Sequence, residues 1–79
     1  MLELYQFEGC PYCQKVREKL TELELDYICR NVPKGSDRTL LKKLGGQEQV
    51  PFLVDSSNGE ITMMYESDDI VEYLEENYG

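Results

Sequence analysis

Two cysteines, three positions apart, mark the point where a predicted strand meets a predicted helix. Residues 2–7 alternate in side-chain type, which predicts a short strand. Over residues 11–23 apolar side chains recur at helical spacing with charged residues between them, which predicts an amphipathic helix. Pro11 suits the first helical position, where a missing N–H is tolerated. We therefore expect Cys10 at the helix N-cap and Cys13 one turn further along.

The rest of the chain continues the alternation of strands and helices. The pattern predicts strands at 26–32, 51–54 and 61–65 and helices at 36–44 and 67–78. Ser36 and Ser67 are expected to cap the two helices, and Gly45-Gly46 to end the first of them. The segment 33–35 is expected to end the second strand, and Asn58-Gly59 to form a hairpin turn.

The order of these elements, βαβ followed by α and ββα, predicts an α/β fold. A strand–helix–strand unit makes a right-handed crossover between parallel strands, and a hairpin adds an antiparallel pair. We therefore expect a four-stranded mixed sheet flanked by helices. A chain of 79 residues accommodates one domain, which we place at 1–79.

Charge and hydropathy argue against several classes of partner. The net charge of −8 provides no basic surface for nucleic acid or for an anionic membrane. No apolar run approaches the roughly 20 residues of a membrane span, and the first residues do not resemble a signal peptide. Three cysteines are a poor match to a secreted disulfide framework, so we expect a cytoplasmic protein.

A Cys-x-x-Cys motif inside a βαβ pattern is typical of thiol–disulfide chemistry. The amides of Tyr12 and Cys13 can donate to the Cys10 sulfur, and the helix dipole favours a negative charge there. The dipole contributes at most about 2 kcal/mol and each hydrogen bond about 1.5–3 kcal/mol, so the amides are expected to dominate. Cys10, at the exposed helix end, is the predicted nucleophile, and Cys13 is the predicted resolving thiol.

The third cysteine, Cys29, stands alone in the second predicted strand. Free cysteine is commonly a small buried hydrophobic residue, and we expect Cys29 to be one. A structural zinc site takes four protein ligands, whereas the chain has three cysteines and no histidine. No metal site is therefore expected.

Three motifs in a fixed order give the chain a family resemblance. Cys10-Pro11-Tyr12-Cys13, then Gln49-Val50-Pro51, then residues 66–74 resemble glutaredoxins, close to the branch that is similar to the N-terminal domain of glutathione transferases. The resemblance implies a thioredoxin-like fold. It also implies glutathione-dependent reduction of protein or glutathione mixed disulfides by the cysteine pair, with glutathione as co-substrate and no permanently bound cofactor. Disulfide-containing or glutathionylated proteins are the implied partners, and we expect a monomer.

The resemblance also implies how glutathione binds. It implies a cis peptide bond between Val50 and Pro51, which lets the Val50 backbone pair with the cysteine of glutathione. The start of the last helix would hold the γ-glutamyl end. The implied glutathione-binding residues are Tyr12, Gln49, Val50, Pro51, Glu66, Ser67 and Asp68. The candidates for binding the glycine carboxylate are Arg38, Lys42, Lys43, Gln47 and Gln49.

The chain departs from the glutaredoxin pattern in two places. Phe7-Glu8-Gly9 stand where many glutaredoxins have a lysine, which leaves open a thioredoxin-like electron donor served by a flavoprotein reductase. A dimer that holds an iron–sulfur cluster between two Cys10 thiolates and a non-catalytic interaction module are further alternatives. The helical second domain of glutathione transferases does not follow residue 79, so a transferase is not expected.

Overall fold

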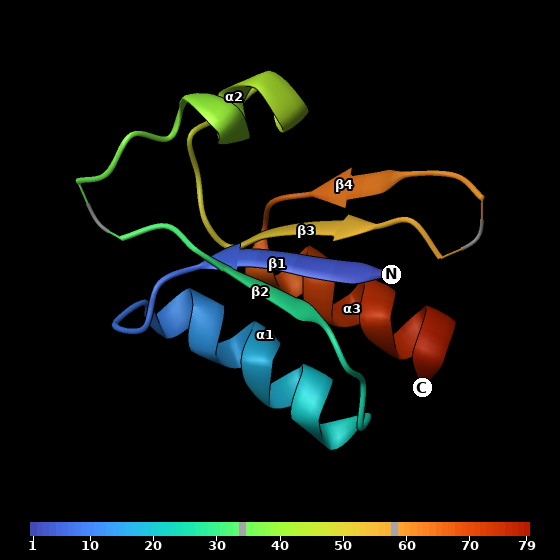
Figure 1. Cartoon of the computed structure of the whole chain (residues 1–79). Coiled ribbons are helices and arrows are strands. Elements are labelled where there is room, and N and C mark those ends of the chain that lie inside the picture. Colours follow the sequence, from blue (N-terminus) through green and yellow to red (C-terminus); the bar gives the residue numbers. More distant parts are fainter. Residues whose placement is uncertain (34, 58) are drawn as a thin grey trace.

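The structure, a computed structural model, describes residues 1–33, 35–57 and 59–79, and Figure 1 shows their arrangement. Its elements in chain order are β1 (Leu2–Gln6), α1 (Pro11–Glu22), β2 (Ile28–Asn31), α2 (Thr39–Gly45), β3 (Phe52–Asp55), β4 (Thr62–Met64) and α3 (Ser67–Tyr78). All seven predicted elements are present, with ends that differ by a few residues. The predicted break at 33–35 and the predicted turn at Asn58-Gly59 each include a residue outside the described part of the chain.

The four strands form one mixed sheet in the order β2-β1-β3-β4. β1 pairs with β2 in parallel across the α1 crossover, and β3 pairs antiparallel with both β1 and β4. α1 and α3 cover one face of the sheet and α2 covers the other (Figure 1). This is the predicted α/β, thioredoxin-like arrangement of βαβ, α and ββα.

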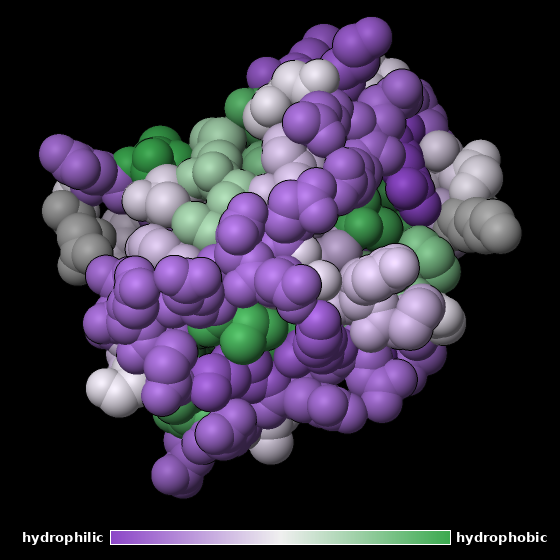
Figure 2. Space-filling view, turned by 180° about the vertical axis from the view of Figure 1, so that it is seen from behind, coloured by the Kyte–Doolittle hydropathy of each residue, from purple (hydrophilic) through white to green (hydrophobic). Residues whose placement is uncertain are grey.

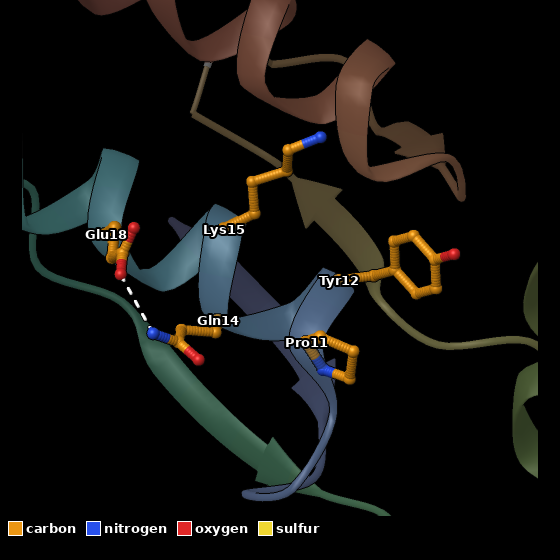
Figure 3. Close-up of a pocket in the computed structure, with 5 residues that line it drawn as sticks. All are labelled: Pro11, Tyr12, Gln14, Lys15 and Glu18. Carbon is orange, nitrogen blue, oxygen red and sulfur yellow. Dashed lines mark hydrogen bonds between the residues drawn. The ribbon is translucent and has the colours of Figure 1, made fainter.

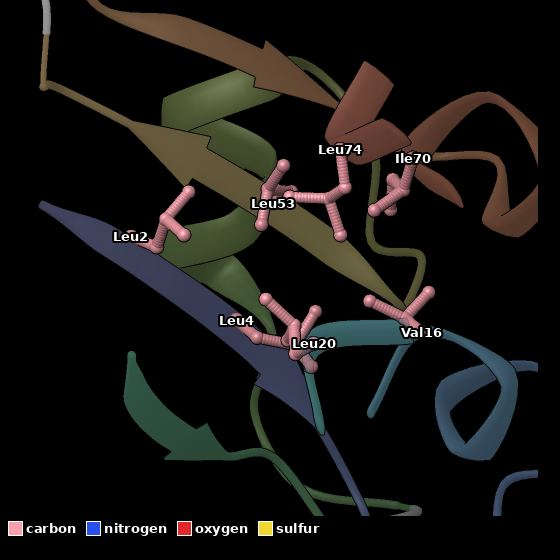
Figure 4. Close-up of a cluster of buried hydrophobic side chains, with 7 residues drawn as sticks. All are labelled: Leu2, Leu4, Val16, Leu20, Leu53, Ile70 and Leu74. Atoms are coloured by element: carbon pink, nitrogen blue, oxygen red, sulfur yellow. The ribbon is translucent and has the colours of Figure 1, made fainter. Parts of the chain in front are cut away.

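Alternation along the two central strands divides the core into two layers. The larger layer lies under α1 and α3 (Figure 4) and contains Leu2, Leu4, Val16, Leu20, Leu53, Ile70 and Leu74. The smaller layer lies under α2 and contains Tyr5, Leu41, Phe52 and Val54. Because successive strand residues face opposite sides, β1 and β3 each contribute to both layers. The central strands are therefore fixed from both faces, and they support the loops at their ends.

The prediction that Ser36 and Ser67 cap helices is wrong. α2 begins at Thr39 with Arg38 at the N-cap, and the Asp37 carboxylate accepts the Thr39 N–H at 2.9 Å. Ser67 is the first residue of α3, because Glu66 is the N-cap residue and its carbonyl accepts the Ile70 N–H at 2.9 Å. The termination of α2 is confirmed, since Gly46 is left-handed with φ 91°.

The prediction that Cys29 is buried is also wrong. β2 is an edge strand of the sheet, and Cys29 is exposed there. Its sulfur accepts a hydrogen bond from Gln6 Nε2 at 3.1 Å. An alternating pattern does not reveal which strand lies at an edge, because strand order is a tertiary property.

The surface is strongly polar on the face opposite to the view of Figure 1. Hydrophilic residues predominate there, and hydrophobic residues appear as separate patches (Figure 2). Within the described ranges, no helix combines the length and apolar character needed to cross a bilayer.

Candidate active site

The first turn of α1 places the cysteine pair at the carboxyl end of β1. Cys10 is the N-cap residue, with φ −82° and ψ 115°, and Pro11 opens the helix, as predicted. The Cys10 sulfur accepts the Cys13 N–H at 3.2 Å. The capping bond therefore exists, and its donor is the amide of Cys13 rather than the expected pair of amides.

The two sulfur-bearing side chains are less accessible than the sequence suggests. Cys10 was predicted at an exposed helix end, but it is 5% exposed, and Cys13 is 0% exposed. The Cys10 side chain turns back over the first turn of its own helix to reach the Cys13 amide. Tyr12, between them, is 64% exposed and extends away from α1 (Figure 3).

The buried position of Cys13 has an electrostatic consequence. Burial raises the pKa of the Cys13 thiol to about 12, and the hydrogen bond with Cys10 acts in the same direction. A backbone hydrogen bond with Phe7 and the positive charge of Arg17 oppose this change, with smaller effects. At neutral pH Cys13 is therefore a protonated thiol and a poor nucleophile until it loses its proton.

A partly buried polar network centred on Gln6 lies near the cysteine pair, and the sequence did not single it out. Gln6 is 2% exposed, and its carbonyl oxygen accepts a hydrogen bond from Arg17 Nη1. Its amide nitrogen donates to Asn31 Oδ1 at 2.6 Å as well as to Cys29. The network joins β1, α1 and β2, and it fixes the Arg17 guanidinium one turn beyond Cys13.

A pocket of about 220 Å³, which we call the Pro51 pocket, opens between the start of α1, the loop before β3 and the start of α3. The Val50–Pro51 peptide bond is cis, as predicted. The residues that line the pocket are Tyr12, Gln49, Val50, Pro51, Glu66, Ser67 and Asp68. The structure thus brings together, in one pocket, the seven residues that the sequence singled out beside the cysteines.

The candidates for binding a terminal carboxylate separate in the structure. Gln49 lines the Pro51 pocket, and its Nε2 donates to Glu66 Oε1 at 3.2 Å. Arg38 donates to the Glu48 carbonyl at 3.3 Å and lies 5.8 Å from the centre of the Phe7 ring. Lys42 and Lys43 are exposed near the end of α2. Of this set, Gln49 is the residue that the fold places in the pocket.

Tyr65, which the sequence did not single out, anchors the loop that leads to the Pro51 pocket. Its hydroxyl accepts the Gln47 N–H at 3.0 Å and lies within hydrogen-bond distance of the Leu41 and Gln47 carbonyls, at 3.1 and 2.9 Å. Its ring stacks on Phe52 with centroids 4.5 Å apart. Within the described part of the chain, no three His, Cys, Asp or Glu side chains are grouped to hold a metal ion.

Comparison with known families identifies the domain. The profile of the glutathione S-transferase N-terminal domain matches residues 4–79. The chain belongs to the glutathione S-transferase N-terminal domain family. Comparison with curated proteins gave no match.

Several solved structures match this chain over a minor part of their own length. Leishmania TDR1, a trimeric glutathione transferase, is 28% identical over 100% of this chain and 18% of its own, with a TM-score of 0.85. A glutathione S-transferase from the Antarctic clam Laternula elliptica is 30% identical over 98% of this chain and 35% of its own, with a TM-score of 0.84. Glutaredoxin 2 from Salmonella typhimurium, solved in complex with glutathione, is 26% identical over 94% of this chain and 32% of its own, with a TM-score of 0.81. This glutathione S-transferase N-terminal domain therefore spans about a third or less of the length of these three proteins.

Proposed function

We propose that this domain is a glutathione-dependent thiol–disulfide oxidoreductase of the glutaredoxin type. The observation that carries the proposal is the Cys10 sulfur at the N-cap of α1, where it accepts the Cys13 amide. A donor amide and the positive end of the helix dipole both stabilise negative charge near the start of a helix, where a nucleophilic sulfur is useful. Relatives with this fold include glutathione transferases and a glutaredoxin, and the Cys10/Cys13 pair favours redox chemistry over transfer.

The Pro51 pocket supports glutathione as the co-substrate. Its lining combines the start of α3, where no side chain caps the first N–H groups, with the carboxylates of Glu66 and Asp68. Amides at a helix start bind a carboxylate, and a side-chain carboxylate binds a neighbouring ammonium. The γ-glutamyl end of glutathione carries both of these groups on one carbon atom.

The reaction then proceeds by two thiol–disulfide exchanges. The Cys10 thiolate attacks the glutathione sulfur of a mixed disulfide, forms a Cys10–glutathione disulfide and releases the substrate thiolate. The thiolate of a second glutathione attacks the glutathione sulfur of this disulfide. Oxidised glutathione is released, and the Cys10 thiolate is restored. The high pKa of Cys13 favours this route at neutral pH over resolution by Cys13, because the buried thiol must first lose its proton.

Turnover of a glutathionylated peptide with glutathione, glutathione reductase and NADPH tests the proposal. We expect wild-type protein and the Cys29→Ser control to be active. The turnover rate of Cys10→Ser should be at least about 100-fold lower, because this variant lacks the nucleophile. Cys13→Ser is expected to retain activity on this substrate. Full activity in Cys10→Ser would refute the assignment, and reduction by a flavoprotein thioredoxin reductase without glutathione would favour the electron-donor alternative.

A further inference from the structure

Two lysines of α1 form ion pairs with carboxylates of α3. Lys15 Nζ contacts Asp68 Oδ1, and one turn later Lys19 Nζ lies 2.7 Å from Glu75 Oε2. Figure 3 shows the Lys15 side chain extending from α1 toward α3. Asp68 lines the Pro51 pocket, whereas Glu75 does not. The two pairs join the same helices, but the first alone involves a residue of the pocket.

The two carboxylates of the pocket differ in their partners. Glu66 accepts a hydrogen bond from the neutral amide of Gln49, and it forms no ion pair with another described residue. Asp68 is already paired with the ammonium group of Lys15. No lysine or arginine of the described residues lines the pocket itself. In the free protein, the Lys15 ammonium therefore balances the charge of one of the two carboxylates that line the Pro51 pocket, that of Asp68.

The Lys15–Asp68 pair is weak enough to be displaced. The side chains are 51% and 83% exposed, and exposed ion pairs of this kind contribute between zero and about 1 kcal/mol. The ammonium of a γ-glutamyl group has the same charge and the same donors as Lys15 Nζ. The carboxylate of Asp68 can thus exchange one ammonium for the other at little cost.

We propose that Lys15 is a specificity-determining residue of the Pro51 pocket, whose ammonium occupies Asp68 in the free protein and is displaced by the α-ammonium of a γ-glutamyl ligand. The inference rests on the proposed function, because it takes this pocket to be the γ-glutamyl site. A ligand without the ammonium leaves the Lys15–Asp68 pair intact. Lys15 consequently reduces the preference of the pocket for an amino-bearing ligand over its deamino counterpart.

The test compares two ligands that differ in this one group. S-methyl glutathione cannot undergo thiol exchange, and its deamino analogue carries a glutaryl group in place of the γ-glutamyl group. We would measure both Kd values by NMR titration of wild-type protein, Lys15→Gln and Lys19→Gln. The ratio of the deamino Kd to the amino Kd is expected to rise about two- to five-fold in Lys15→Gln. The two ligands differ by one positive charge, so the general effect of losing a lysine charge on this ratio is measured separately with Lys19→Gln.

Lys19→Gln is the matched control, because it removes the same charge and a similar bridge between α1 and α3 away from the pocket. The ratio of the deamino Kd to the amino Kd in Lys19→Gln should equal that of wild-type protein. In an Asp68→Asn background, Lys15→Gln should leave the ratio unchanged, because the shared carboxylate is gone. An unchanged ratio in Lys15→Gln, or an equal rise in Lys19→Gln, would overturn the inference and leave the proposed function standing. Failure of wild-type protein to bind S-methyl glutathione would overturn both.

Discussion

Among single residues, Cys10 and Cys13 have different environments although one turn of helix separates them. Cys10 occupies the N-cap, where its sulfur accepts an amide, and Cys13 lies inside the helix with 0% of its surface exposed. Burial removes water from the Cys13 sulfur and disfavours its charged form. The same motif thus provides one sulfur that accepts an amide at the helix start and one buried sulfur that is kept as a thiol.

The high pKa of Cys13 predicts how alkylation of this thiol depends on pH. In the variant Cys10→Ser/Cys29→Ser, burial, which is the largest cause of the change, still raises the Cys13 pKa above its ordinary value. The rate of reaction with iodoacetamide should therefore increase about ten-fold per pH unit from about pH 7 to about pH 9, without a plateau. The same variant unfolded in urea is the control and should level off near the ordinary thiol pKa of about 8.5. A plateau below about pH 9 in the folded protein would contradict the assignment.

At the scale of elements, α2 and the loop before β3 are held by Tyr65, just after β4. Its hydroxyl bonds to the backbone of Leu41 and Gln47, and its ring lies against Gly45 at the end of α2. A Cβ at Gly45 would lie 2.8 Å from two carbon atoms of the Tyr65 ring. Gly45 is therefore required by a close approach between two elements.

Gly45→Ala should lower the free energy of unfolding by about 1–3 kcal/mol, because the ring must move and its hydrogen bonds must weaken. The better helix propensity of alanine offsets at most about 1 kcal/mol of this loss. Gly9→Ala is the matched control, since a Cβ there meets Phe7 at an ordinary 4.0 Å. Urea denaturation followed by circular dichroism measures both variants. Equal stability of the two would mean that the Tyr65 contact does not constrain α2.

At the scale of the whole molecule, a buried carboxylate ties the chain ends to the sheet. Asp55, at the end of β3, is 2% exposed. It accepts hydrogen bonds from Tyr73 Oη at 2.6 Å and Tyr78 Oη at 2.7 Å, both on α3. Its other oxygen accepts the Ser57 N–H at 2.9 Å, and the Met1 ammonium donates to Ser57 Oγ at 2.9 Å. Both termini are thereby linked to one end of the sheet.

The hydrogen bonds to the Asp55 carboxylate predict that the folded protein loses stability in acid. Burial alone would raise the pKa of the Asp55 carboxyl, but the hydrogen bonds from Tyr73, Tyr78 and Ser57 outweigh it and lower the pKa to about 2. Because the folded pKa lies below the unfolded value, the stabilisation is complete above about pH 4 and is lost as the pH falls through about 2. The difference in pKa corresponds to about 2 kcal/mol.

Between about pH 5 and about pH 2, the free energy of unfolding should therefore decrease by about 2 kcal/mol less in Asp55→Asn than in wild-type protein. Urea denaturation at a series of pH values gives the free energy of unfolding directly. Asp26→Asn is the control, because Asp26 is exposed and the same change in charge should leave the acid dependence intact. If acid lowered the free energy of unfolding equally in Asp55→Asn and in wild type, a group other than Asp55 would have to cause the loss of stability.

The helices and strands could be predicted from the amino-acid sequence, because their formation depends on interactions between near neighbours along the chain. Helical spacing after Pro11 fixed the start of α1, and with it the N-cap position of Cys10. The βαβ order fixed the parallel pairing of β1 with β2. The cis bond before Pro51 followed from the family resemblance, since a local pattern does not distinguish cis from trans.

The burial of single residues and the contacts between distant residues could not be predicted from the sequence, because they depend on which elements pack together in the folded protein. Cys29 is exposed on β2, which lies at an edge of the sheet, whereas Cys10 is only 5% exposed although it lies at the start of α1. The pairing of Lys15 with Asp68 and the contact of Tyr65 with Gly45 join residues far apart in the chain. Such contacts have no periodicity in the sequence, because they arise only when α1 packs beside α3 and α2 packs over the sheet.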